Sequence, residues 1–137
     1  MTYEEKKAWL KRYRQALAEE AMLAAELEQL RAEAERVTPV LTGMPGGGTN
    51  VNQIPQAVER IVQVQEQLNE QMEQAALIRK EIAEMIEQIR PARAREILRR
   101  RYILGQRWER ISEEMYMDRS WMLRLHRRII ESMQIST

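Results

Sequence analysis

With 137 residues, 44% of them hydrophobic and 31% charged, the chain has room for one domain, or for one small domain with an extended appendage. The absence of cysteine excludes disulfides and thiolate metal sites, and the absence of phenylalanine argues against a thick globular core. The formal net charge of +1 conceals an asymmetry, because residues 1–90 carry a net charge of −4 and residues 91–137 a net charge of +5. Such a basic end indicates a polyanionic partner.

The first residues are charged and show no signal-peptide apolar region, as Glu4, Glu5, Lys6 and Lys7 illustrate. No run of 18 apolar residues occurs in the sequence, so we expect a cytoplasmic protein with no membrane partner. Glu, Gln, Arg, Ala, Leu and Met dominate the composition, whereas strand-favouring residues are sparse. These residue types predict an all-α fold.

A first long helix is predicted from about Tyr3 to Arg36, where no proline or glycine occurs. Its apolar residues recur at steps of three and four, with one polar gap at Glu20, and they are Trp9, Tyr13, Ala16, Leu23, Leu27, Leu30, Ala34 and Val37. A loop over about residues 38–54 follows, beginning at Thr38-Pro39 and containing four of the five glycines. It lacks the strand and the Lys-Ser/Thr of a phosphate-binding loop, so we interpret it as a plain connector.

A second long helix is predicted from near Pro55 to just before Pro91. Its stripe alternates steps of four and three throughout, at Ile54, Val58, Ile61, Gln65, Leu68, Met72, Ala75, Arg79, Ile82, Ile86 and Ile89. A seven-residue repeat of this length is typical of a supercoiled helix pair. Residues 1–90 are therefore expected to form an antiparallel coiled-coil hairpin for oligomerisation or partner contact. Gln65 and Arg79 either fix the register within the core or lie at the edge of the stripe.

Residues 91–137 predict three short helices. The first spans about Ala92 to Leu104, turns Ile97, Leu98 and Tyr102 inward, and ends at Gly105. The second spans about Arg107 to Met115, with Trp108, Ile111 and Met115 on one face. Asp118, the only aspartate, precedes the third helix, where a carboxylate caps free amides, so we predict that it is an N-cap rather than a catalytic group.

The third helix, about Arg119 to Met133, predicts a buried face and a basic face. The buried face holds Met122, Leu125, Ile129 and Met133, and the opposite face holds Ser120, Arg124, Arg127, Arg128 and Glu131, with Trp121 at its margin. A short helix, a three-residue turn and a helix with an arginine-rich outer face are typical of the helix-turn-helix, whose second helix enters the major groove of DNA.

Arginine suits this role because its planar fork grips guanine edges or phosphates with two hydrogen bonds. The candidates for reading bases are Ser120, Trp121 and Arg124, and the candidates for holding phosphates are Arg107, Arg119, Arg127 and Arg128. Exposed arginines also serve solubility alone, and Trp121 could instead pack on its own module or on a partner.

His126 is the only histidine, and it has no cysteine or carboxylate pattern around it, so we interpret it as structural and expect no metal and no cofactor. One histidine, one aspartate and no cysteine on thin helices offer little for acid–base or nucleophilic catalysis. We therefore expect a protein that is not an enzyme.

The segment from Arg95 to Ile111 resembles region 4 of bacterial sigma factors, in which an "RE-x-x-L-x-x-RY" helix and a glycine precede the DNA-reading helix. Leu125-His126-Arg127 is similar to the "LHRAL" ending of that region, although Ile129-Ile130 stands where alanine and leucine are usual. Nothing in the chain resembles a promoter-melting region, so the resemblance does not imply a complete sigma factor.

Nearly the whole chain resembles a family of phage and prophage proteins of Gram-positive bacteria that includes RinA/ArpU-like transcriptional regulators. The resemblance rests on three motifs: Trp9-Leu10 with Arg12-Tyr13-Arg14, Val37-Thr38-Pro39 with Met44-Pro45-Gly46-Gly47-Gly48, and Arg101-Tyr102-Ile103 with Gly105, Trp108 and Glu109. It implies a transcriptional regulator.

The sequence thus favours a DNA-binding transcriptional regulator of phage type, with residues 91–137 on double-stranded DNA and the hairpin forming a homo-oligomer, a dimer in preference to a ring. RNA polymerase is a further expected partner. The alternative is a DNA-packaging or assembly component, such as a small terminase-like helical oligomer. A third hypothesis is that the sigma-like module serves protein contacts only.

Overall fold

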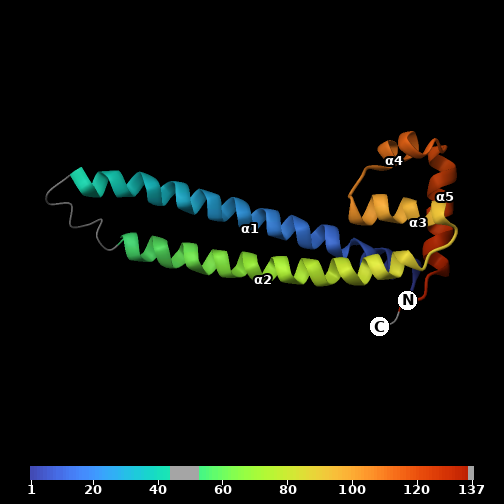
Figure 1. Cartoon of the computed structure of the whole chain (residues 1–137), viewed down its shortest axis with the longest axis horizontal. Helices are drawn as coiled ribbons and strands as arrows, with labels where there is room; N and C mark the ends of the chain where they lie inside the picture. Colours follow the sequence, from blue (N-terminus) through green and yellow to red (C-terminus); the bar gives the residue numbers. More distant parts are fainter. Residues whose placement is uncertain (44–52, 136–137) are drawn as a thin grey trace. The chain divides into compact units, whose positions relative to one another are not determined.

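The structure, a computed structural model, describes residues 1–43 and 53–135, and the side chains of residues 1–36 and 55–135. Within these ranges there is no strand. The elements are α1 (Tyr3–Gly43), α2 (Gln53–Glu87), α3 (Ala92–Leu98), η1 (Arg99–Ile103), α4 (Trp108–Met115) and α5 (Arg119–Ser132) (Figure 1). The prediction of an all-α chain with a long helical hairpin followed by a helical module is confirmed.

The described residues form two compact units. We call Leu17–Gln74 the hairpin unit, and Met1–Ala16 together with Ala75–Thr137 the C-terminal unit. The module predicted over residues 91–137 therefore lies in one unit with the start of α1 and the end of α2. In neither range does a helix carry the long apolar stretch that crossing a lipid bilayer requires.

The predicted break at Thr38-Pro39 is wrong, because α1 continues to Gly43. A proline removes one hydrogen bond from a helix and bends it, but the helix can resume beyond it. α2 begins at Gln53, so Pro55 lies in its first turn as expected. The glycine-rich residues 44–52, which were predicted to be a plain connector, lie outside the described residues.

Part of the predicted stripe of α2 is displaced by one residue. Val58 and Met72 are half exposed and Arg79 is exposed, whereas Val64 is fully buried and Ile78 packs against the core. Between residues 61 and 89 the buried and half-buried positions are Ile61, Val64, Gln65, Leu68, Gln71, Ala75, Ile78, Ile82, Ala83, Met85, Ile86 and Ile89. The seam includes Val64 and Ile78 where Gln65 and Arg79 were predicted, which gains apolar burial, and it keeps the predicted Ile82, Ile86 and Ile89.

Gln65 and Arg79 therefore flank the seam and do not interrupt its core. The side-chain carbonyl of Gln65 accepts a hydrogen bond of 3.0 Å from Arg31, and its amide donates one of 3.0 Å to Asn69. The hairpin unit has its own small core of Leu27, Val64 and Leu68, flanked by Leu23, Leu30 and Ile61. The stripe predicted for α1 supplies the first of these three core residues.

The core of the C-terminal unit joins both ends of the chain. Its largest cluster comprises Leu10, Ile82, Ile86, Ala94, Leu98, Tyr102, Ile103, Ile129, Ile130 and Met133. A second cluster comprises Ile97, Ile111, Met115, Met117 and Met122. The sequence pattern missed Leu10, which is completely buried beside the predicted Trp9.

The helix predicted over Ala92–Leu104 divides into α3 and a single π-helical segment, η1. In η1 the amide of Leu104 donates to the carbonyl of Arg99, five residues earlier, at 3.0 Å. This wider turn lets Tyr102 and Ile103 both face the core, although only Tyr102 was expected there. The chain then turns at Gly105, whose φ of 70° favours glycine and ends the element as predicted.

Candidate nucleic-acid interface

α4 and α5 are joined by a three-residue turn, Tyr116 to Asp118. Tyr116 adopts a left-handed conformation (φ 54°, ψ 46°), and its amide and that of Met117 donate to the last carbonyls of α4. The carboxylate of Asp118 then accepts a hydrogen bond of 3.2 Å from the amide of Trp121. The prediction that Asp118 caps the last helix is confirmed, and the cap fixes where α5 begins.

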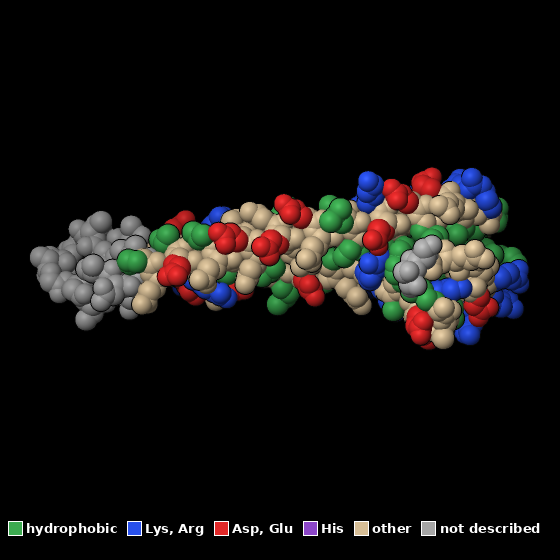
Figure 2. All heavy atoms as spheres, turned by 90° about the horizontal axis from the view of Figure 1, so that it is seen from below, with side chains coloured by type: hydrophobic (Ala, Val, Ile, Leu, Met, Phe, Trp, Pro, Cys, Tyr) green, Lys and Arg blue, Asp and Glu red, His purple; other side chains and the backbone are tan. Residues whose placement is uncertain are grey.

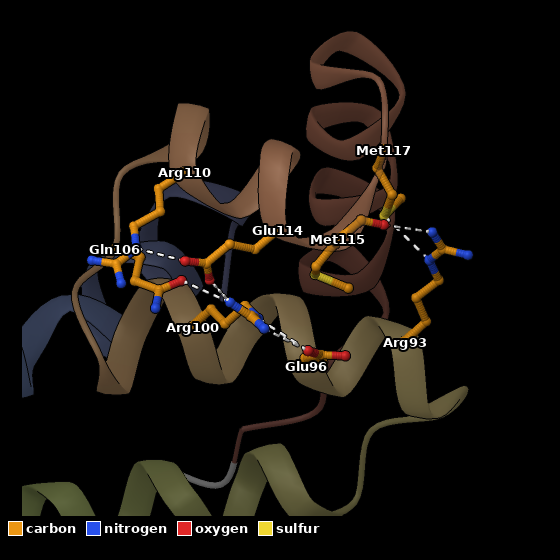
Figure 3. A network of polar contacts seen from close by, with 8 residues as sticks. All are labelled: Arg93, Glu96, Arg100, Gln106, Arg110, Glu114, Met115 and Met117. Carbon is orange, nitrogen blue, oxygen red and sulfur yellow. Dashed lines mark hydrogen bonds and ion pairs between the residues drawn. The ribbon is translucent and has the colours of Figure 1, made fainter.

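Arg100 ties η1 to α4 through a network of polar contacts (Figure 3). Its guanidinium bonds the carboxylates of Glu96 and Glu114 and the side-chain carbonyl of Gln106. Arg110, one turn before Glu114 on α4, donates to the same carboxylate at 2.8 Å. The hydrogen bonds from Arg110 and Arg100 lower the pKa of Glu114, which keeps this carboxylate charged and the network intact at neutral pH.

Arg93 holds the turn itself from the side of α3. It donates to the carbonyl of Met115 at 3.0 Å and contacts the sulfur of Met117 at 3.3 Å (Figure 3). The hydroxyl of Ser112 donates to the carbonyl of Met117, which is buried. These contacts orient α4 and the turn, and hence the first residues of α5, on the rest of the unit.

α5 has one buried and one exposed face. Met122, His126, Ile129 and Ile130 are buried and Leu125 is half-buried. The seven predicted site residues are all exposed, and they are Arg107, which precedes α4, and Arg119, Ser120, Trp121, Arg124, Arg127 and Arg128 of α5. On the face shown in Figure 2, Lys and Arg side chains gather over the C-terminal helices.

The predicted arginines differ in what they contact. Arg119 pairs with Glu109 at 3.1 Å, and Arg127 pairs with Glu131 at 2.8 Å. Arg107, Arg124 and Arg128 form no ion pair within residues 1–43 and 53–135. These three guanidinium groups can therefore bind an external anion without first breaking an ion pair.

The start of α1 reaches the C-terminal half of α5. The guanidinium of Arg127 lies over the ring of Tyr3, 4.5 Å from its centroid, and Lys6 donates to the carbonyl of Glu131 at 2.8 Å. The basic face of α5 is therefore accessible at Ser120, Trp121 and Arg124 and partly covered by the start of α1 at Arg127. Sequence patterns gave no signal for this contact, because residues 3 and 127 are joined only by the tertiary fold.

Two aromatic side chains stand at the N-terminal end of this face. The indole of Trp121 is 46% exposed, and Tyr116 in the turn is 92% exposed. Tyr116 was not among the predicted site residues. Its position in the turn, two residues before the Asp118 cap, is the only sequence signal that could have included it.

His126 is buried, as a structural histidine would be, and Nε2 lies 2.7 Å from the hydroxyl of Tyr102. Its ring also forms a T-shaped contact with that of Trp108, with the ring centroids 4.8 Å apart. No protein-family model matches the chain, and comparisons with curated proteins and with solved structures found no match.

Proposed function

We propose that this chain is a cytoplasmic, non-enzymatic DNA-binding regulator of transcription, of the phage and prophage type that its sequence resembles. The observation that carries this proposal is the exposed face of α5, on which Arg124 and Arg128 have no ion pair within the described residues. The opposite face is buried around Met122 and Ile130, so the helix is anchored and its basic side is displayed.

The dimensions of α5 suit the major groove. Its 14 residues give a length of roughly 20 Å, and a helix with its side chains fits a groove about 12 Å wide. The turns after the Asp118 cap would approach base edges, with Arg124 forming two hydrogen bonds to a guanine. Arg107 and Arg128 would contact phosphates on either side of the groove.

The two arginines that form ion pairs, Arg119 and Arg127, remain available to DNA at a small cost in free energy. The pairs of Arg119 with Glu109 and of Arg127 with Glu131 are both exposed to solvent, and exposed pairs contribute only about 0–1 kcal/mol. Phosphate contacts can replace them. We therefore expect Arg119 and Arg127 to strengthen binding without selecting the sequence.

A selection of bound duplexes from a random pool, followed by fluorescence anisotropy titrations, tests the proposal. On the selected site, Arg124→Ala should cost about 1–3 kcal/mol and relax the preference at one base pair. Arg128→Ala should weaken binding to all sequences alike and reduce the salt slope by about 0.9. Arg79→Ala, which removes an exposed arginine from α2, is the matched control. If all three variants bind DNA with the affinity of the unmodified chain, DNA recognition by α5 is rejected.

The hairpin supports the proposed homo-oligomer. Met22 of α1 and Val58, Val62 and Met72 of α2 are each about half exposed or more, which leaves apolar surface for another copy. Light scattering that gives a dimer fits the regulator. A ring of many copies would instead favour the alternative, a DNA-packaging or assembly component.

RNA polymerase is the further partner that we propose. Retained binding to polymerase in Arg124→Ala, with DNA affinity unchanged from that of the unmodified chain, would indicate that the sigma-like module serves protein contacts only. Loss of DNA binding with retained polymerase binding fits the regulator.

A further inference from the structure

A cleft of about 280 Å³ opens within the C-terminal unit, beside the basic face of α5. Residues from α1, η1, α4 and α5 line it, and they include the cations Lys7, Lys11, Arg101 and Arg127 and the aromatic side chains of Tyr3 and Trp108. None of its lining residues is an aspartate or a glutamate. Elements from both ends of the chain thus bring four positive charges to one concave surface.

The positive charge of this cleft is only partly compensated. Lys7 lies 3.6 Å from Glu4, and Arg127 pairs with Glu131. Lys11 and Arg101 have no carboxylate partner in the part of the chain that the structure describes. Lys11 is exposed, and the Arg101 guanidinium donates to the carbonyl of Gln106 at 3.1 Å.

His126, which also borders the cleft, responds to this charge. Burial lowers its pKa to about 4, and the positive charges of Lys7, Arg101 and Lys11 act in the same direction. Lys7 and Lys11 of α1 and Arg101 of η1 therefore all act on the ring of His126. This convergence favours an anionic ligand.

The aromatic rings add a second kind of surface. Arg101 lies over the indole of Trp108 at 4.8 Å, and the ring of Tyr3 has Lys7 at 5.2 Å and Arg127 at 4.5 Å from its centroid. Flat rings beside cations suit a ligand that joins a planar base to phosphate. The volume lies near the roughly 300 Å³ at the lower end of small-molecule pockets, so the ligand is small.

We propose that this cleft binds a free nucleoside phosphate, with Lys11 and Arg101 holding the phosphates and the base lying against the aromatic side chains of Tyr3 and Trp108. The site is separate from the DNA-reading residues Ser120, Trp121 and Arg124, and it does not depend on DNA binding.

Isothermal titration calorimetry of the full chain with ADP, inorganic pyrophosphate and adenosine tests this proposal. ADP should bind, with an affinity that falls as salt is added, pyrophosphate should bind more weakly, and adenosine should bind weakest. Lys11→Gln should weaken ADP binding roughly tenfold or more, because it removes a hydrogen bond between charged groups. Lys80→Gln, which removes an exposed lysine of α2 outside the cleft, should leave ADP binding unchanged.

Arg101→Gln should also weaken ADP binding, and circular dichroism will show whether it folds. Lys11 is exposed, so Lys11→Gln should fold. Its effect on ADP binding therefore decides the test even if Arg101→Gln unfolds. Three results would overturn the proposal: no binding of ADP at millimolar concentration, an ADP affinity that Lys11→Gln leaves unchanged, or pyrophosphate binding as tightly as ADP. A titration with duplex DNA completes the experiment. If Lys11→Gln weakens DNA binding while ADP does not bind, the cleft contacts the DNA backbone and the nucleotide proposal is wrong.

Discussion

The hydroxyl of Tyr102, on η1, lies 2.7 Å from Nε2 of His126, on α5, and both side chains are buried. Burial raises the pKa of the Tyr102 phenol and lowers that of His126 to about 4, so both groups are neutral at pH 7. The hydroxyl and Nε2 therefore share one proton in a hydrogen bond between two neutral groups. This hydrogen bond is a specific polar link between η1 and the buried face of α5.

This link predicts that acid destabilises the C-terminal unit through His126. The pKa of His126 is about 4 in the folded protein, against 6.5 for the unperturbed group, so the unfolded chain takes up the proton first. The stabilisation is complete above about pH 6.5 and is lost as the pH falls towards 4, by an amount on the order of 3 kcal/mol. Urea unfolding at several pH values measures it.

His126→Gln provides the reference for that measurement. It should be less stable than the unmodified chain at pH 7.5, because a buried hydrogen bond is altered, but its stability should change less between pH 6.5 and 4. Carboxylates that titrate in this range affect both proteins equally, so the difference between the two curves isolates His126. Parallel curves would show that His126 does not carry the effect.

The left-handed backbone conformation of Tyr116 predicts that replacing this residue by glycine stabilises the protein. Its φ of 54° is left-handed, where a side chain other than that of glycine costs roughly 1–2 kcal/mol, and its 92% exposed ring recovers little by packing. Tyr116→Gly should therefore raise the free energy of unfolding by about 1 kcal/mol, measured by urea titration. Tyr116→Phe keeps the Cβ atom and should leave stability unchanged. A destabilised glycine variant would mean that the tyrosine ring makes a contact that outweighs the backbone cost.

The displaced seam of α2 predicts a contrast between two neighbouring residues. Val64 is fully buried in the hairpin unit, so Val64→Ala should cost about 2 kcal/mol. Gln65, at the edge, should tolerate alanine within about 0.5 kcal/mol. Thermal unfolding of both variants measures this contrast, and equal costs at the two positions would contradict the burial of Val64.

Leu10 predicts that the start of α1 is part of the C-terminal core. It is completely buried in a cluster with Leu98 and Ile130, so Leu10→Ala should cost roughly 2–5 kcal/mol. Met22→Ala, at a side chain that is 73% exposed, is the control and should change stability little. A mild effect at Leu10, equal to that at Met22, would contradict the packing of this segment.

The features that the sequence predicted are local ones. The two long helices, the Asp118 cap and the two faces of α5 depend on spacing within single helices, and spacing is visible in the sequence. The predicted seam of α2 was wrong in part because apolar residues also occur at positions 64 and 78, one residue from the predicted stripe, and only packing against α1 selects between the two.

Other features depend on residues far apart in the chain. The contact between Tyr3 and Arg127, and the burial of Leu10 among residues of α3 and α5, arise only when both ends of the chain meet. The π-helical turn η1 likewise follows from placing Tyr102 and Ile103 in one core together, which no local pattern indicates. For the same reason the cleft between α1 and α5 could not be predicted.

The composition of the C-terminal core has a consequence for chain synthesis. One of its members is Leu10 and another is Met133, so the ribosome must synthesise the chain as far as Met133 before this core can close. Residues 17–74 contain all of the Leu27–Val64–Leu68 cluster and can pair as soon as they emerge. We therefore expect the hairpin unit of the nascent chain to fold first, and the segment around Leu10 to find its core only after Met133 has been synthesised.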